Sequence, residues 1–155
     1  MRIRVLAVGT RMPAWVVAGT QEYSKRLPRQ VRLDWVEVAA AKRQAQSADK
    51  CRALEAAAIR KKLRDHERVV ALDVAGDLVS TEDIAQALST DGTEAADLAI
   101  VIGGPDGLHP ELLAEANRRW SLGRITLPHP LVRIVLVEQL YRAWSINAGH
   151  PYHRA

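Results

Sequence analysis

Apolar and polar positions change along the chain in blocks that predict five strands separated by helices. Buried strands are expected at residues 3–8, 68–73 and 98–102, where β-branched and aliphatic residues follow one another. Residues 31–38 alternate apolar and polar positions with one break, which is typical of a half-buried strand. A brief fifth strand is predicted at residues 124–127. This order predicts an α/β fold with a mostly parallel sheet and helices on both of its faces.

Helices are expected between these strands, where starting signals and apolar spacings of three and four occur. The predicted starts carry proline or a side chain that can cap a helix: Pro13, Ser47 or Asp49, Ser80, Pro110 and Pro130. The predicted ends lie near Leu27, Arg64, Leu88, Arg119 and Asn147. The last helix is apolar almost all round, which indicates burial on more than one side. In so short a chain this favours a subunit interface, and we expect a symmetric homodimer.

The length and composition bound the class of protein. A chain of 155 residues fits one domain, residues 1–155, and 48% hydrophobic with 26% charged residues is typical of a globular protein. No apolar run approaches the roughly 20 residues that span a bilayer, and no signal-peptide core follows Met1. With Cys51 as its one cysteine, the chain has neither an internal disulfide nor a zinc framework. These observations predict a cytoplasmic protein without membrane contact.

Charge is distributed in blocks along the sequence. Residues 1–68 and 118–155 are basic, whereas residues 69–117 contain acids but no Lys or Arg. The net charge is +4, and most basic residues are arginine, whose planar fork suits bidentate contacts with phosphate. A nucleic acid is therefore the favoured partner. Compositional bias from a GC-rich genome is the alternative, since it also enriches Ala and Arg.

Candidate binding residues follow the predicted strands, because open α/β sheets bind ligands beyond the carboxyl ends of their strands. These turns follow Leu72 and Asp73, contain Gly103, Gly104 and Gly107, or span residues 122–127. The glycines allow a close approach of backbone to ligand, although they also fit a plain tight turn. The pattern is neither GxGxxG nor a P-loop, which excludes the standard dinucleotide and NTPase fingerprints. No metal site is expected.

Seven short motifs occur along the chain in this order: VGTRMP (8–13), LD (72–73), IGGPDGL (102–108), WSL (120–122), TLPHPLVR (126–133), EQLYRAWSI (138–146) and HPYHR (150–154). Over the whole chain they resemble the SPOUT class of methyltransferases, and within it the RlmH type that modifies bacterial large-subunit ribosomal RNA. The resemblance implies S-adenosylmethionine as cofactor and methylation of N3 of a pseudouridine in 23S rRNA, within the ribosome. It also implies a homodimer and a C-terminal trefoil knot. The implied cofactor contacts are Leu72, Gly103, Leu122, Gly123, Arg124, Ile125, Thr126 and Leu127.

Roles in catalysis can be assigned on the same basis. We expect Arg142 and Arg154 to clamp a phosphate or the negative charge that develops beside N3, because arginine does not readily take up a proton. His129 or His153 would accept the N3 proton, with His153 favoured because a mobile tail can close over the base. Tyr152 would stack on that base.

The basic N-terminal block is the expected rRNA footprint, and phosphate contacts of this kind give affinity with little sequence information. It comprises Arg2, Arg4, Arg11, Lys25, Arg26, Arg29, Lys42 and Arg43. Two other functions stay open: a non-catalytic ribosome-binding or assembly factor on the same fold, and a nucleotide- or flavin-binding oxidoreductase. The glycine turn at 103–107 and the tail at 150–154 favour the methyltransferase over both.

Overall fold

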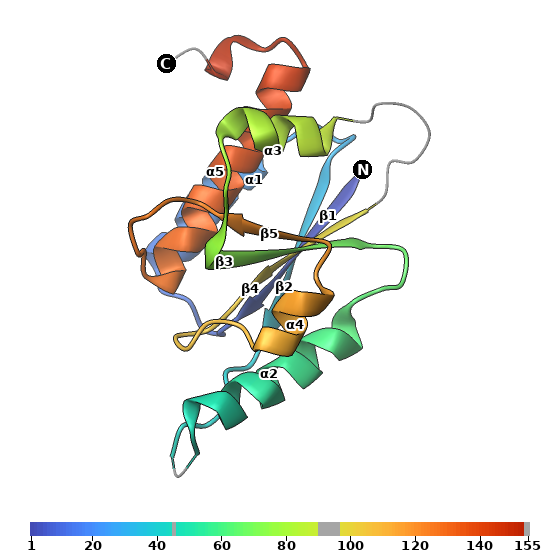
Figure 1. The fold of residues 1–155 in the computed structure, drawn as a ribbon. Coiled ribbons are helices and arrows are strands. Elements are labelled where there is room, and N and C mark those ends of the chain that lie inside the picture. Colours follow the sequence, from blue (N-terminus) through green and yellow to red (C-terminus); the bar gives the residue numbers. More distant parts are fainter. Residues whose placement is uncertain (45, 90–96, 154–155) are drawn as a thin grey trace.

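The computed structural model describes residues 1–44, 46–89 and 97–153, and its core is one five-stranded parallel sheet (Figure 1). The strands are β1 (Arg2–Val8), β2 (Arg32–Val38), β3 (Arg68–Leu78), β4 (Leu98–Ile102) and β5 (Arg118–Ser121), and their order in the sheet is β2-β1-β4-β3-β5. The helices are α1 (Ala14–Ser24), α2 (Ala48–Lys62), α3 (Thr81–Leu88), α4 (Pro110–Glu115) and α5 (His129–Asn147), followed by the short η1 (Pro151–His153). The predicted α/β class with a parallel sheet is confirmed.

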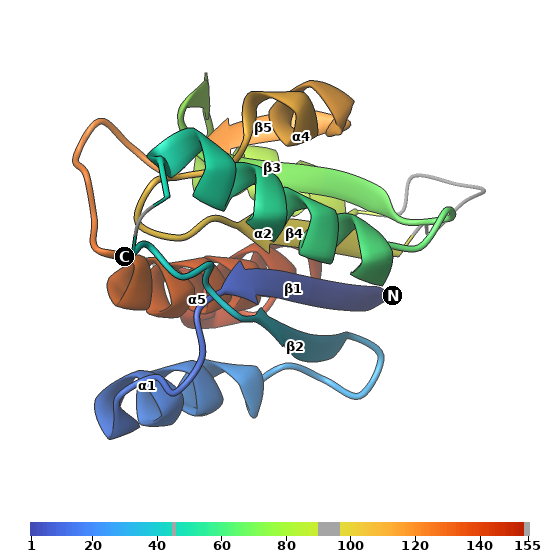
Figure 2. The same cartoon turned by 90° about the horizontal axis from the view of Figure 1, so that it is seen from below.

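Both faces of the sheet are covered, because alternate side chains of each strand enter different apolar clusters. On one face Val5 packs in a cluster with Leu136 of α5, and on the other Leu6 packs in a cluster with Ile59 of α2 and Leu112 of α4. Figure 2 shows α2 and α4 on one side of the sheet and α5 and α1 on the other. Strands with both faces buried explain the continuous apolar runs in the sequence.

The apolar coat of α5 is largely used inside one chain. The helix lies between the sheet, α3 and α1, and Leu136, Leu140 and Ala143 are fully buried. Its contact with α1 is close because Gly19 has no side chain: a Cβ there would lie 2.8 Å from Ile134 Cδ1. Burial on several sides was expected, but for these residues neighbouring elements of the same chain provide it. Among the residues described, no helix is long and apolar enough to cross a bilayer.

The fifth strand lies earlier than predicted. Residues 118–121 form β5, although the preceding helix was expected to continue to about Arg119, and residues 124–127, expected to form the strand, are irregular. The reason is a pairing made just after α4: the backbone N–H of Asn117 donates to Val69 O (2.9 Å), and its side-chain oxygen accepts from Val69 N (2.7 Å). These bonds align the following residues with β3, so tertiary pairing overrides the local helix signal.

Candidate active site

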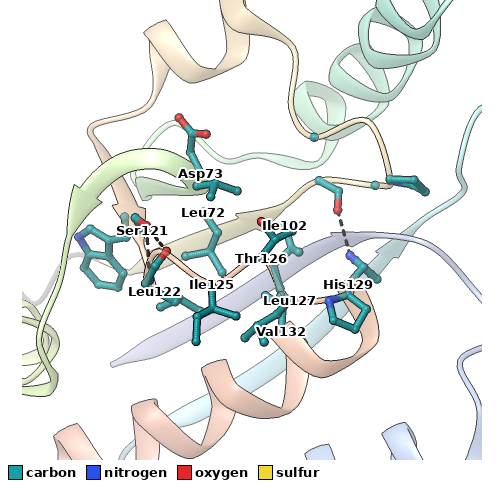
Figure 3. Close-up of a pocket in the computed structure, with 18 of the residues that line it drawn as sticks. Leu72, Asp73, Ile102, Ser121, Leu122, Ile125, Thr126, Leu127, His129 and Val132 are labelled. Carbon is teal, nitrogen blue, oxygen red and sulfur yellow. Dashed lines mark hydrogen bonds between the residues drawn. The ribbon is translucent and has the colours of Figure 1, made fainter.

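A cavity of about 560 Å³ lies at the carboxyl ends of β4 and β5, beside the middle of β3 and against the beginning of α5 (Figure 3). Three segments line it: the residues that begin at Leu72 in β3, the turn at residues 102–107, and the chain from β5 into α5. This volume suits a small-molecule cofactor, and the predominance of apolar lining side chains allows water to be excluded. The parallel sheet therefore forms a pocket at the edge where such sheets bind ligands.

The glycine turn has a shape that only glycine allows at its first position. A Cβ on Gly103 would lie 2.7 Å from the carbonyl carbon of Gly107 and 2.9 Å from its oxygen. The turn closes through a hydrogen bond from Gly107 N to Gly104 O (2.9 Å), and Gly107 has a φ of 78°, in the left-handed region. Its outer side is held by an ion pair between Asp106 and Arg43 (2.6 Å). Backbone, rather than side chain, therefore forms this wall of the pocket.

Seven of the eight expected cofactor residues line the cavity: Leu72, Gly103, Leu122, Gly123, Ile125, Thr126 and Leu127. Arg124, the eighth, is exposed and is not among the lining residues. Lining residues outside the expected set include Ile102, Trp120 and Val132. All three stand in motifs noted above (102–108, 120–122 and 126–133), but they were not assigned to the cofactor, because buried apolar residues in strands and helices are typical of any core.

His129 lines the pocket but has no nitrogen free to accept a proton. Its Nδ1 lies 2.9 Å from the carbonyl oxygen of Gly103, and Arg133 Nε donates to its Nε2 at 3.0 Å. A carbonyl can only accept, so this network assigns the hydrogen to Nδ1 and the lone pair to Nε2. Burial, and then the neighbouring Arg133 charge, lower the pKa of His129. The expectation that His129 could take the N3 proton is therefore wrong for this arrangement.

A second group of side chains, called the tail group below, joins Tyr152 and His153 of η1 to Glu138, Arg142 and Ser145 of α5. The Tyr152 hydroxyl donates to Glu138 Oε1 (3.2 Å), which also accepts from Arg142 Nε (2.9 Å) and Nη2 (2.6 Å). The Tyr152 ring meets that of Tyr141 edge-on, with centroids 4.5 Å apart. Burial first, and then the Glu138 carboxylate, raise the pKa of Tyr152. His153 Nδ1 lies 3.5 Å from the hydroxyl of Ser145, and Arg154 lies outside the described residues.

The pocket is lined by the first residues of α5, whereas η1 follows the opposite end of this helix (Figure 1). Ser145, the neighbour of His153, follows His129 by 16 residues, or about 24 Å at 1.5 Å per residue. His153 therefore does not reach the pocket of its own chain in this conformation.

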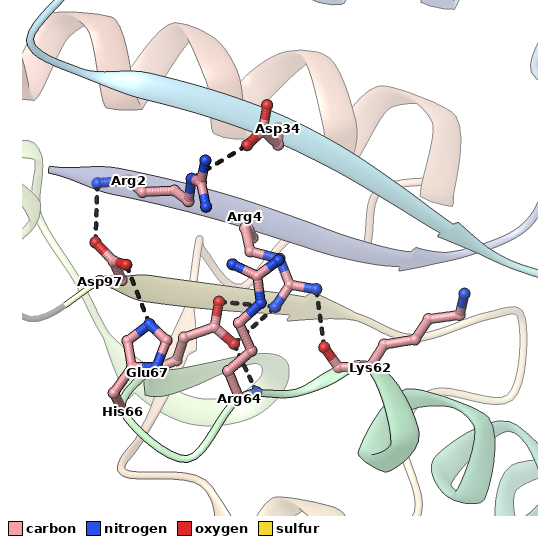
Figure 4. Close-up of polar contacts among 8 residues, drawn as sticks. All are labelled: Arg2, Arg4, Asp34, Lys62, Arg64, His66, Glu67 and Asp97. Atoms are coloured by element: carbon pink, nitrogen blue, oxygen red, sulfur yellow. Dashed lines mark hydrogen bonds and ion pairs between the residues drawn. The ribbon is translucent and has the colours of Figure 1, made fainter.

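Among the expected RNA contacts, Arg4 is wrongly assigned. It is buried in the sheet: its Nη1 donates to both carboxylate oxygens of Glu67 (2.7 and 2.8 Å), and its Nη2 donates to Lys62 O (2.8 Å) (Figure 4). A guanidinium held in this way is not available to a phosphate. Arg2 is half-buried beside it and pairs with Asp34 (3.5 Å). Both arginines lie at the amino ends of the strands, away from the pocket.

The other expected RNA contacts are more accessible. Arg11 is exposed and has a φ of 56°, which non-glycine residues rarely adopt. Lys25 and Arg26 are exposed at the end of α1, where both pair with Glu22 (2.7 Å each). The Arg26 guanidinium also lies 5.9 Å from the centre of the Tyr152 ring, which places it in the tail group.

Comparison with known proteins gives consistent results over the whole chain. Ribosomal RNA large subunit methyltransferase H from Chromohalobacter salexigens is 55% identical, covering 99% of this chain and all of its own. The proteins of that name from Alkalilimnicola ehrlichii and Pseudomonas aeruginosa are 51% and 47% identical, and each is covered completely. A solved structure, a probable methylase family protein from Haemophilus influenzae, shares the fold with a TM-score of 0.58 at 14% identity, covering 99% of this chain and 70% of that one.

One family model matches nearly the entire sequence. It is described as "Predicted SPOUT methyltransferase" and covers residues 1–153. The match includes every strand of the sheet and each segment that lines the cavity. The chain therefore belongs to the SPOUT methyltransferase family.

Proposed function

We propose that this S-adenosylmethionine-dependent methyltransferase methylates N3 of a pseudouridine in 23S rRNA, within the ribosome. The observation that carries the proposal is the cavity of about 560 Å³ at the strand ends, formed by the segments in which cofactor contacts are expected. The names of the 47–55% identical relatives support large-subunit ribosomal RNA as the substrate. Because ribosomes are its substrate, the enzyme would act in the cytoplasm.

In the proposed mechanism the backbone of the three pocket segments binds the cofactor, and the apolar side chains exclude water. The bound cofactor supplies an electrophilic methyl group on a sulfonium. The residues of this chain would place N3 of the target base against that methyl group and take up the proton that N3 loses. Positioning of the two reactants supplies much of the acceleration.

The residues near the C-terminus, Arg142 and those at 152–154, would bind the target base and accept its proton. Tyr152 would stack on the base, Arg142 and Arg154 would stabilise the negative charge that develops beside N3, and the imidazole of His153 would accept the proton. We keep His153 and not His129 for this role, because both ring nitrogens of His129 are already hydrogen-bonded. The exposed Arg11, Lys25 and Arg26, together with Arg2, would contact rRNA phosphates.

A homodimer would bring the two groups together, since α5 separates them within one chain. Exposed apolar side chains favour such an interface: Trp15 is 54% exposed and Ile125, at the pocket, 80% exposed. In a two-fold dimer the tail of one protomer would complete the pocket of its partner. The trefoil knot implied by the family resemblance stays a prediction.

The proposed function is tested by methyl transfer to ribosomes that lack the modification. Calorimetric titration with S-adenosylmethionine comes first, followed by incubation with ribosomes and mass spectrometry of nuclease fragments of the 23S rRNA. The expected result is one added methyl group on N3 of a pseudouridine. Cofactor binding without transfer to any rRNA fragment would instead favour a non-catalytic assembly factor. Isolated stem-loop RNA serves as the comparison, and equal rates on it would contradict a requirement for the ribosome.

Exchange of tails between protomers gives a direct prediction. We expect His153→Ala to lower turnover at saturating substrate, because the proton acceptor is lost. Mixing this variant with Gly103→Ala, whose pocket is disabled but whose tail is intact, should restore activity when subunits exchange. Recovery is measured by methyl transfer after the two proteins are co-refolded. A mixture that stays inactive while heterodimers form would show that each tail serves its own pocket, and unchanged turnover of His153→Ala would remove this residue as the base.

A further inference from the structure

Arg133 is a buried arginine on the first turns of α5, and the function proposed above gives it no role. Its side chain is 4% exposed, and each of its three nitrogens contacts a different partner. Nε donates to His129 Nε2 (3.0 Å), Nη1 donates to Glu37 Oε2 (2.9 Å), and Nη2 donates to the carbonyl oxygen of Gly9 (2.9 Å). Only the planar fork of arginine can reach three such acceptors at once.

His129 extends these contacts to the pocket. Its Nδ1 hydrogen bond to Gly103 O, drawn in Figure 3, links Arg133 to the glycine turn of the cavity. Gly9 follows β1 and Glu37 lies near the end of β2, so the contacts of Arg133 join the ends of neighbouring strands. One side chain thus connects the glycine turn with a turn that leads to Arg11.

We propose that Arg133 is a positioning residue that holds neutral His129 in place, so that the glycine turn of the cofactor pocket is fixed against the Gly9 turn. The proposal rests on the proposed location of the cofactor in this pocket. Arg133 would act through His129 and Gly9 without touching the cofactor. Because the Gly9 turn continues into Arg11, the same contacts would also orient Arg11, an expected RNA contact.

The arrangement requires a neutral imidazole. A protonated His129 carries hydrogens on both nitrogens, so Nε2 could no longer accept from Arg133 and two cations would be in contact. The charged groups that act on His129 are Arg133, which lowers its pKa, and Glu37, which raises it. Replacing Arg133 by glutamine removes the positive charge beside His129 and leaves the Glu37 carboxylate without its ion pair. The pKa of His129 should then rise, and protonation should begin at a higher pH.

The test is calorimetric titration with S-adenosylmethionine from about pH 6 to about pH 8, where histidine titration is expected to matter. We expect Arg133→Gln to weaken binding roughly ten-fold at the upper pH, equivalent to about 1.4 kcal/mol. Binding should weaken further as the pH falls, more steeply than in the wild type. Arg133→Lys keeps the charge but cannot reach three acceptors, so its affinity should fall while its pH profile stays parallel to that of the wild type.

Arg4→Lys is the matched control, because Arg4 is a comparably buried, multiply bonded arginine at the other end of the sheet. It should lower the melting temperature without changing cofactor affinity or its pH dependence. Nitrogen NMR of the His129 ring adds a measurement that needs no cofactor: the hydrogen should sit on Nδ1, and the ring should titrate at a higher pH in Arg133→Gln.

Wild-type affinity in both Arg133 variants would overturn the proposal, as would an affinity loss in Arg133→Gln that is the same at every pH. A wild-type protein that binds no S-adenosylmethionine would contradict the proposed cofactor site instead. In that case the NMR titration still decides whether Arg133 holds His129 neutral: an unchanged titration in Arg133→Gln would reject the pairing.

Discussion

Gly103→Ala should strongly weaken S-adenosylmethionine binding while the protein stays folded. The new Cβ would lie 2.7 Å from the carbonyl carbon of Gly107, a contact with backbone that no side-chain rotation can relieve. The turn must open, which displaces one wall of the pocket and the carbonyl that His129 contacts. We expect affinity to fall by roughly 100-fold or more, at least about 2.7 kcal/mol. Calorimetry gives the affinity, and thermal unfolding should show a loss of about 1–3 kcal/mol from overpacking.

Gly76→Ala is a control for the steric cost alone. A Cβ at Gly76 would lie 2.9 Å from the backbone of Arg119, so the clash is similar, but Gly76 is not among the residues that line the cavity. Comparable destabilisation with cofactor affinity near that of the wild type is the expected result. Binding by Gly103→Ala within a few-fold of the wild type would show that the turn is not part of the cofactor site.

Arg4→Met should destabilise the protein by about 3–5 kcal/mol, the usual cost of leaving a buried charge without its partner. The Glu67 side chain is fully buried, and among the described residues it would keep only the hydrogen bond from the backbone N–H of Arg64 (3.0 Å). Such a loss is a large share of the roughly 5–15 kcal/mol that stabilises a typical domain. Urea unfolding followed by circular dichroism measures the change in midpoint.

Two further variants distinguish the effect of the buried Arg4–Glu67 ion pair on stability from the effect of removing any arginine charge. Arg4→Met combined with Glu67→Gln should recover part of the lost stability, because no unpaired charge remains. Arg2→Met removes a half-exposed partner of Asp34 at 3.5 Å and should cost about 0–1 kcal/mol. An equal effect of Arg2→Met and Arg4→Met would contradict the assignment of Arg4 as a buried structural residue.

Strands and helix ends could be predicted from the sequence where the local signal agrees with the surroundings of the segment in the folded protein. β1 and β4 were predicted from apolar runs, and they lie where both faces of the sheet are covered. The start of α3 was predicted from capping chemistry, and Ser80 and Asp83 each accept the other's backbone N–H (3.0 and 2.9 Å). The pocket segments followed from the general rule that parallel sheets bind ligands at their carboxyl ends.

Residues whose role depends on distant partners were not predictable. β5 carries two exposed arginines and gains its conformation from pairing with β3, which lies far earlier in the chain. Arg4 is charged but stands in a strand with no exposed face, and its partner Glu67 is 63 residues away. Arg133 contacts Gly9, 124 residues earlier, so no local pattern distinguishes it from a surface arginine of a helix.

The parallel sheet has a consequence for how such enzymes can diverge. Binding chemistry lies at the carboxyl ends of the strands, whereas the Arg4–Glu67 pair lies toward their amino ends; on β1, Arg4 is four residues, or about 13 Å, from the strand end at Val8. Substitutions that far apart, with no shared partner, contribute additively to the free energy. Lineages that adapt to heat or salt can therefore exchange residues around Glu67 while the pocket stays as it is, and the two ends of one strand can evolve at different rates.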